Sequence, residues 1–185
     1  LAILLCHGRA GQSTRESLLP VGVARVDITP LGSMWMSGYA GRDRPSEGTE
    51  QPLWAKAVAI GAGEERHVLV TTDLVGIDRT LSLAVRRQIE SHHRIPKSRV
   101  AINCSHTHSG PCVGDCLALQ RDLGPEQQQR VDEYATRLQT LIIELVGQAI
   151  ARQTPCTIAA GKGSCATFAV NRRNNPEKLV PELRA

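Results

Sequence analysis

Aromatic side chains are scarce in this 185-residue sequence, which has one Phe, two Trp and two Tyr. So few rings argue against a protein that stacks the bases of single-stranded nucleic acid on aromatic side chains. Excess positive charge is also small, at a formal +4 with no long basic run, and no stretch reaches the roughly 18 apolar residues that span a membrane. We therefore expect no nucleic-acid partner and no transmembrane segment.

The first residues resemble the tail of a secretory signal peptide. Residues 1–6 form a short apolar run, and Gly8 and Ala10 then place small residues two positions apart, as before a signal-peptide cleavage site. A frayed N-terminal strand is the alternative. We expect residues 1–19 to be a signal-peptide remnant with a linker, residues 20–185 to be part of a longer domain, and the protein to be secreted or periplasmic.

Hydrophobic periodicity predicts an α/β fold. Alternating or short apolar runs predict strands at residues 21–30, 53–60, 67–74, 100–104 and 157–170. Helical spacing predicts helices at residues 80–93 and, after Gly124-Pro125, from 125 to about 152. The order strand, helix, strand over residues 67–104 predicts a βαβ unit with parallel strands. We expect a mixed sheet, with the long helix covering one face.

Two histidines follow the strand at residues 100–104. Residues 105–111 read Ser-His-Thr-His-Ser-Gly-Pro, so His106 and His108 lie at a strand end, where ligands bind in open α/β sheets. If the chain stays extended there, both imidazoles point to the same side. Imidazole is the commonest metal ligand, but a catalytic zinc site needs three protein ligands. This pair supplies at most two of them.

Other polar residues also follow predicted strands or occupy long loops. Asp73 ends a strand, which makes it a pocket candidate, with capping or turn duty as the alternative. Tyr39 and Arg42 lie in the long irregular stretch of residues 31–52 and could line a pocket, with a plain surface loop as the equal alternative. Asn171 and Arg172 could bind an oxyanion or a polar head group through hydrogen bonds, or form a basic surface turn.

The six cysteines leave several alternatives open. Cys112 and Cys116 lie four residues apart, directly after the histidine motif. Such a pair can form a local disulfide, supply thiolates to a metal, or remain as thiols.

Several segments together resemble the N-terminal catalytic domain of the neutral/alkaline, non-lysosomal ceramidases. They are Val-Gly-Val-Ala-Arg-Val-Asp-Ile-Thr at 21–29, Ser-Gly-Tyr-Ala at 37–40, Asp73, Asn-Cys-Ser-His-Thr-His-Ser-Gly-Pro at 103–111, and Ala-Val-Asn-Arg at 169–172. They occur in the family's order and cover nearly the whole chain after residue 20. The resemblance implies the N-terminal part of a larger ceramidase-like domain, close to the short bacterial relatives of unassigned substrate.

The resemblance also implies a function and roles for individual residues. Enzymes of this family are zinc amidases that cleave the N-acyl bond of ceramide to give sphingosine and a fatty acid. By resemblance His106 is a zinc ligand, and His108 and Arg172 are catalytic. The family's other ligands, a His, a Glu and a Tyr, lie further along its chain.

By resemblance, the expected substrate is N-acylsphingosine. Because the sequence departs from the family pattern at Cys112 and at residues 173–174, a related N-acyl lipid or amide is the other expectation. Asn171, Tyr39 and Asp73 are the expected substrate contacts. Contact with a membrane surface, if the substrate is a lipid, is expected to be peripheral.

Two other classes of hydrolase carry a His-x-His motif, and the sequence differs from both. A metallo-β-lactamase-like hydrolase requires His-x-His-x-Asp-His, which the residues after His108 do not provide. Barrel amidohydrolases carry His-x-His on their first strand, whereas here the strand that leads into it comes after three earlier predicted strands. The main alternative is a secreted, non-catalytic binding module that retains the domain.

Overall fold

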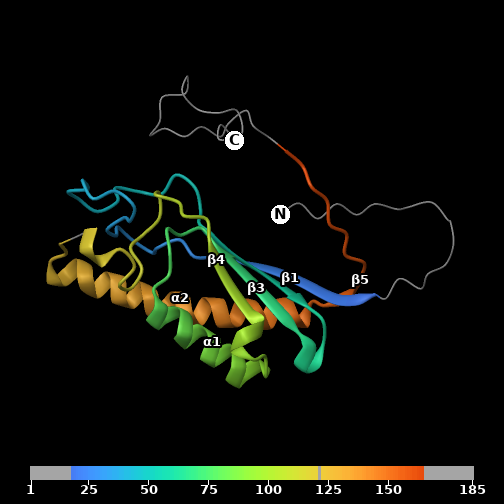
Figure 1. Cartoon of the computed structure of the whole chain (residues 1–185). Helices are drawn as coiled ribbons and strands as arrows, with labels where there is room; N and C mark the ends of the chain where they lie inside the picture. Colours follow the sequence, from blue (N-terminus) through green and yellow to red (C-terminus); the bar gives the residue numbers. More distant parts are fainter. Residues whose placement is uncertain (1–17, 121, 165–185) are drawn as a thin grey trace.

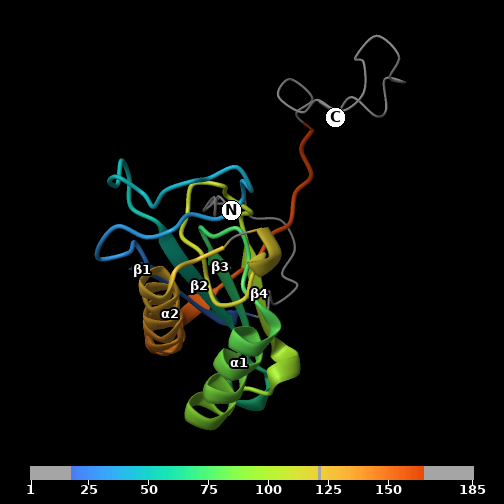
Figure 2. The ribbon, with the colours of Figure 1, turned by 90° about the vertical axis from the view of Figure 1, so that its left-hand side faces the viewer.

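The computed structural model describes residues 18–120 and 122–164. They form a five-stranded sheet in the order β4-β3-β2-β1-β5, with both α-helices against one face (Figures 1 and 2). In chain order the elements are β1 (Leu19–Asp27), β2 (Trp54–Ile60), η1 (Gly63–Glu65), β3 (His67–Thr72), α1 (Arg79–His93), η2 (Lys97–Arg99), β4 (Val100–Cys104), η3 (Ala118–Gln120), α2 (Pro125–Ala151) and β5 (Thr154–Cys156). β3 and β4 pair in parallel, and the other described pairings are antiparallel. The predicted mixed sheet and α/β class are confirmed.

Small side chains let α2 lie close to the middle of the sheet. Ala55, Ala57 and Ala59 alternate along β2 and are buried, because every second residue of a strand points to the same face. At Gly22 of β1 the approach is closer still. A Cβ atom there would lie 1.9 Å from the carbonyl oxygen of Ala149 in α2, so only glycine fits without a shift of the helix.

The predicted βαβ unit is β3, α1 and β4. Asp78 caps α1, since its Oδ1 atom accepts a hydrogen bond from the Leu81 amide at 2.9 Å. Leu81, Val85 and Ile89 are buried, as the helical spacing predicts. The helix ends at His93, and the left-handed conformation of the next residue, Arg94 (φ 54°), turns the chain back toward β4.

α2 is the long covering helix that the apolar stripe predicts. Pro125 starts it, in the first turn, where a missing amide hydrogen costs nothing. Its buried residues are Val131, Tyr134, Leu138, Ile142, Leu145, Val146 and Ala149. The Tyr134 hydroxyl donates a 2.7 Å hydrogen bond to the Ile28 carbonyl, and burial raises the pKa of this phenol well above its usual value. Neither α2 nor any other helix in the described ranges has the length and apolar character needed to cross a bilayer.

The strand predicted at residues 157–170 is wrong over its described part. The observed strand, β5, is short and earlier in the chain, and residues 157–164 have no regular secondary structure. The physical reason lies in the ladder: Cys156 pairs with Leu19, the first residue of β1. From residue 157 onward, no residue of β1 remains to pair with. Residues 165–170 lie outside the described residues.

The connecting loops position the candidate site. The segment between β1 and β2 and the segment between β4 and α2 lie together at one end of the sheet, the left end in Figure 1. β5 and residues 157–164 leave from the opposite end. The histidine motif belongs to the first group of loops.

Candidate functional site

The ends of the two parallel strands bring Asp73 and the histidine motif to the same edge of the sheet. Thr72, the last residue of β3, pairs with Cys104, the last residue of β4. The Ser105 amide donates to the Thr72 carbonyl oxygen at 3.0 Å and extends this contact by one residue. The chain therefore enters the histidine motif directly beside Asp73, as parallel pairing requires.

His106 is held in one orientation by the loop after β3. Its Nδ1 atom lies 2.9 Å from the carbonyl oxygen of Val75. Because a carbonyl oxygen only accepts, Nδ1 carries the hydrogen in this contact, and in the neutral ring Nε2 then has the lone pair. His106 is exposed to solvent, so this arrangement presents a ring nitrogen suited to binding a metal ion.

The chain does not stay extended through the motif, which corrects one premise of the sequence analysis. β4 ends at Cys104, and His106 has a positive φ of 59°, a left-handed conformation that is uncommon for a side-chain-bearing residue. The imidazoles of His106 and His108 are nevertheless neighbours, with ring centroids 5.1 Å apart and planes inclined by 63°. The left-handed main-chain conformation at His106, rather than strand alternation, accompanies this approach of the two rings.

Residues 37–40 pack against His108, although they lie far away in the sequence. The ring of Tyr39 meets the His108 ring edge-on, with centroids 4.7 Å apart. Gly38 has a φ of 103°, and a Cβ atom there would lie 2.5 Å from Cγ of His108. Position 38 therefore has room for the imidazole only because it is glycine. The structure brings together three of the predicted site residues: Tyr39, His106 and His108.

Main-chain hydrogen bonds join this loop to the histidine motif. The Ser37 amide donates to the Gly110 carbonyl at 3.0 Å, and the Cys112 amide donates to the Trp35 carbonyl at 2.8 Å. Between them, Met36 and Pro111 form an isolated antiparallel bridge. The position of Tyr39 relative to His108 is thus fixed by the backbone as well as by ring packing.

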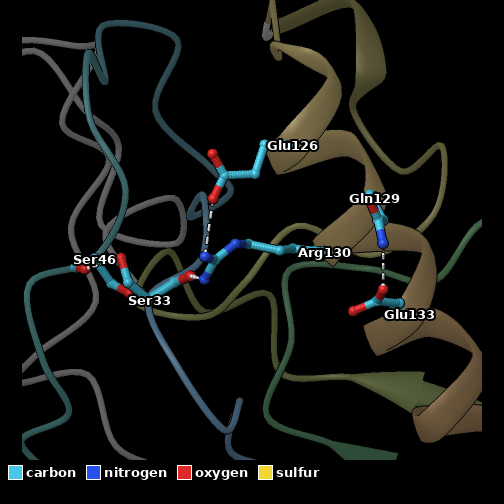
Figure 3. A network of polar contacts seen from close by, with 6 residues as sticks. All are labelled: Ser33, Ser46, Glu126, Gln129, Arg130 and Glu133. Atoms are coloured by element: carbon cyan, nitrogen blue, oxygen red, sulfur yellow. Dashed lines mark hydrogen bonds and ion pairs between the residues drawn. The ribbon is translucent and has the colours of Figure 1, made fainter.

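A polar network on α2 anchors the same loop at another point. Arg130 donates to the Ser33 carbonyl and to the Glu126 carboxylate, each at 3.0 Å, while the Ser33 hydroxyl donates to the Ser46 carbonyl (Figure 3). Ser33, Glu126 and Arg130 border a hollow of about 510 Å³ between the loop and α2. Since their polar groups bond one another, the network is best understood as structural support for the loop.

Asp73 uses its carboxylate to hold the start of β2. Its Oδ2 atom accepts a 2.9 Å hydrogen bond from the Trp54 amide, and its own amide donates to the Trp54 carbonyl at 3.0 Å. This contact between neighbouring strands is structural, but it is neither a helix cap nor a turn. A contact between Asp73 and a substrate stays a prediction, as does one through Asn171. Asn171 and Arg172 lie outside the described residues.

The described residues can supply only part of a zinc site. Across residues 18–120 and 122–164, no group of three or more His, Cys, Asp or Glu side chains is placed to hold a metal ion. Cys112 and Cys116 are not joined by a disulfide, and neither completes such a group. The donor that fits a metal is Nε2 of His106, whose ring is oriented through its other nitrogen.

A cavity of about 620 Å³ lies on the neighbouring surface of the motif. Thr107, Ser109 and Pro111 line it, together with Met36 and residues of the 46–51 segment. Tyr39, His106 and His108 are not among its lining residues. The imidazole pair and this cavity therefore belong to different surfaces of the loop.

Sequence reasoning missed two contributors to the site. The Val75 carbonyl orients His106, but a main-chain acceptor leaves no trace in residue identity. Gly38 makes room for His108, and its signal was present: a Ser-Gly-Tyr sequence inside an otherwise irregular stretch.

Fold and site together define a mixed α/β domain with an oriented histidine pair at the carboxyl end of its parallel strands. The family model for neutral/alkaline non-lysosomal ceramidase, N-terminal, matches residues 19–179. The chain belongs to this family, and the predicted relationship is confirmed.

Solved ceramidase structures share the fold. A crystal structure of neutral ceramidase from Pseudomonas aeruginosa superposes with a TM-score of 0.59 and 24% sequence identity, over 75% of this chain and 22% of that one. A structure of a ceramidase complexed with C2 gives the same values. At this identity the likeness establishes the fold. The chain spans 22% of the length of these ceramidases.

Proposed function

We propose that this chain is the N-terminal part of a zinc-dependent hydrolase of linear amides. The proposed substrate is N-acylsphingosine, cleaved to sphingosine and a fatty acid, or a related N-acyl lipid or amide. One observation carries the proposal: the hydrogen bond from Nδ1 of His106 to the Val75 carbonyl. A metal-binding histidine commonly donates its second ring nitrogen to a carbonyl or carboxylate in this way. Membership of the ceramidase family supports amide chemistry at the site.

The residues divide into metal binding, catalysis and substrate contact. His106 would hold the ion through Nε2, with further ligands from outside the described residues. When bound, zinc supplies Lewis acidity and lowers the pKa of a coordinated water to about 7. His108 and Arg172 would donate hydrogen bonds to the amide oxygen as negative charge develops on it. Tyr39, Asn171 and the Oδ1 atom of Asp73 are the proposed substrate contacts.

The proposal includes a place of action. Residues 1–19 resemble a signal-peptide remnant, so we propose a secreted or periplasmic protein that meets its lipid substrate at a membrane surface. N-terminal sequencing of the mature full-length protein tests this point. A start near Gly11 is expected, and an uncleaved cytosolic N-terminus would contradict it.

The decisive experiment measures metal and activity on the full-length protein. We expect about one zinc ion per chain and hydrolysis of a fluorogenic N-acylsphingosine, both lost on treatment with a chelator and regained with Zn²⁺. A water-soluble fluorogenic N-acyl amide, assayed in parallel, separates a lipid hydrolase from a general amidase. Activity that persists in metal-free protein would overturn zinc dependence.

A non-catalytic binding module is the second candidate. Within the described residues there is no group of three metal-binding side chains, and this candidate applies if the rest of the full-length chain does not complete one. Full-length protein that binds an N-acyl lipid, contains no zinc and hydrolyses neither substrate would establish this candidate instead.

A further inference from the structure

Arg42 reaches from the β1–β2 loop to the histidine motif, 66 positions further along the sequence. Its Nη2 atom donates a 2.7 Å hydrogen bond to the main-chain carbonyl oxygen of His108. Its Cζ atom lies 5.3 Å from the centre of the Tyr39 ring, within the range of a cation–π contact. Tyr39 in turn packs edge-on against the His108 imidazole. One guanidinium therefore contacts both the main chain of His108 and the ring that supports its side chain.

We propose that Arg42 is a positioning residue for His108, holding its imidazole beside His106 in the orientation that the reaction requires. The proposal rests on the proposed function, since it assigns the support of a catalytic group. A planar guanidinium can donate from its edge and stack with its face at the same time, which the compact ammonium of lysine cannot do. A charged donor also binds a carbonyl oxygen more strongly than a neutral one does.

The remaining contacts of Arg42 indicate that its charge is directed at this site. Its Nη1 atom lies 3.7 Å from Sδ of Met36 in the same loop. No carboxylate of the described residues forms an ion pair with it, and the side chain is half-buried. Arg44 behaves differently, because it pairs with Glu47 at 3.1 Å on an exposed surface. Arg44 is therefore a matched control in the same loop.

The first test compares steady-state kinetics of full-length Arg42→Ala and Arg44→Ala with the wild type. An orienting residue acts on the transition state, so we expect Arg42→Ala to lower kcat by about 10- to 100-fold with little change in KM. Zinc content should stay at the wild-type level, and Arg44→Ala should retain wild-type kinetics. An unchanged kcat in Arg42→Ala, or an equal loss in Arg44→Ala, would overturn the proposal.

The second test asks whether Arg42 acts through His108. In the His108→Ala background, Arg42→Ala should lower kcat by less than about threefold, because two residues that work as a unit are not additive. Additive losses, as expected for a general effect on folding, would contradict the proposal.

A structural readout separates this inference from the proposed function. Crystal structures of the full-length wild type and Arg42→Ala should differ at His108, with its ring displaced from Tyr39 in the variant. An unmoved ring would overturn the positioning role whether or not the protein hydrolyses amides. A displaced ring in a protein without amidase activity would support the positioning of His108 and contradict the proposed function alone.

Discussion

The Nδ1 atom of His106 lies 2.9 Å from the carbonyl oxygen of Val75, and this contact joins the loop after β3 to the loop after β4. It selects the ring tautomer in which Nε2 has a free lone pair, and it does so without using a second side chain. The metal-binding character proposed for this edge of the sheet depends on that one main-chain acceptor.

The first prediction concerns His106 itself. In the full-length protein, His106→Ala should lose zinc and amidase activity together, because the substitution removes a direct ligand. Metal analysis and hydrolysis assays on the same preparation test this. Full zinc retention in His106→Ala would falsify the ligand assignment.

The second prediction separates His108 and Arg172 from the metal ligand. His108→Ala and Arg172→Ala should keep most of the zinc and lose about a hundredfold or more in kcat, the usual cost of removing a transition-state donor. The zinc content and kcat of each variant are the measurements. Wild-type amidase rates in both would show that neither side chain acts in the reaction.

The third prediction uses the close approach of Gly38 to His108. Gly38→Ala should displace the imidazole and force a positive φ on alanine, costing about 1–3 kcal/mol of stability together with a loss of kcat. Gly41 is the matched control, since a Cβ atom there meets nothing within 4 Å. Gly41→Ala should therefore stay within about 0.5 kcal/mol of the wild type. Urea unfolding and kinetics test both, and equal behaviour of the two variants would contradict the steric explanation.

The fourth prediction concerns Tyr134 and stability alone. Tyr134→Phe removes the hydroxyl that satisfies the Ile28 carbonyl, so the free energy of unfolding should fall by about 1–2 kcal/mol. Zinc content should not change, because no described contact joins this hydroxyl to the histidine motif. An unchanged urea midpoint would show that water replaces the lost hydroxyl at no cost.

The fifth prediction is a pH dependence that originates at His93. Burial lowers the pKa of this imidazole from its ordinary value of 6.5, with smaller contributions from His92 and Arg66, while a hydrogen bond with the Ile143 main chain acts in the opposite direction. The unfolded chain therefore takes up the proton first as the pH falls. The contribution of His93 to stability is complete above pH 6.5 and is lost as the pH falls through the lower, folded-state pKa.

The measurement for His93 is urea unfolding at about pH 7.5 and about pH 5. His93→Gln should lose part of the acid sensitivity of the wild type, whereas His92→Gln, one residue earlier and exposed, should retain it. An identical acid sensitivity in wild type and His93→Gln would contradict this origin.

Much of the scaffold is predictable from the sequence because, within each strand or helix, the buried side chains recur at the regular spacing of that element. The alternation of Ala55, Ala57 and Ala59 gives the buried face of β2, and Leu81, Val85 and Ile89 give that of α1. Predicting a strand over residues 157–164 failed because a strand needs a partner, and the partner β1 begins at Leu19. Periodicity in one segment contains no information about where another segment begins.

The site is predictable only in part, for a different reason. The sequence identifies His106, His108 and Tyr39 as candidates, and the structure places their rings together. The left-handed conformation of His106 and the acceptor at Val75 depend on the path of the main chain. The same holds for the contact of Arg42 with the His108 carbonyl, which requires two distant loops to meet.

The main-chain hydrogen bonds between residues 35–37 and residues 110–112 affect the order in which the protein folds. Forming this contact orders a long loop and lowers the conformational entropy of the chain. The loss is smallest after β2, β3, α1 and β4 have formed, because they have then already brought the two segments near each other. The scaffold can therefore assemble while the histidine pair is still unsupported. By the same reasoning, the loop can open locally with the sheet intact, so the protein can lose its site without unfolding.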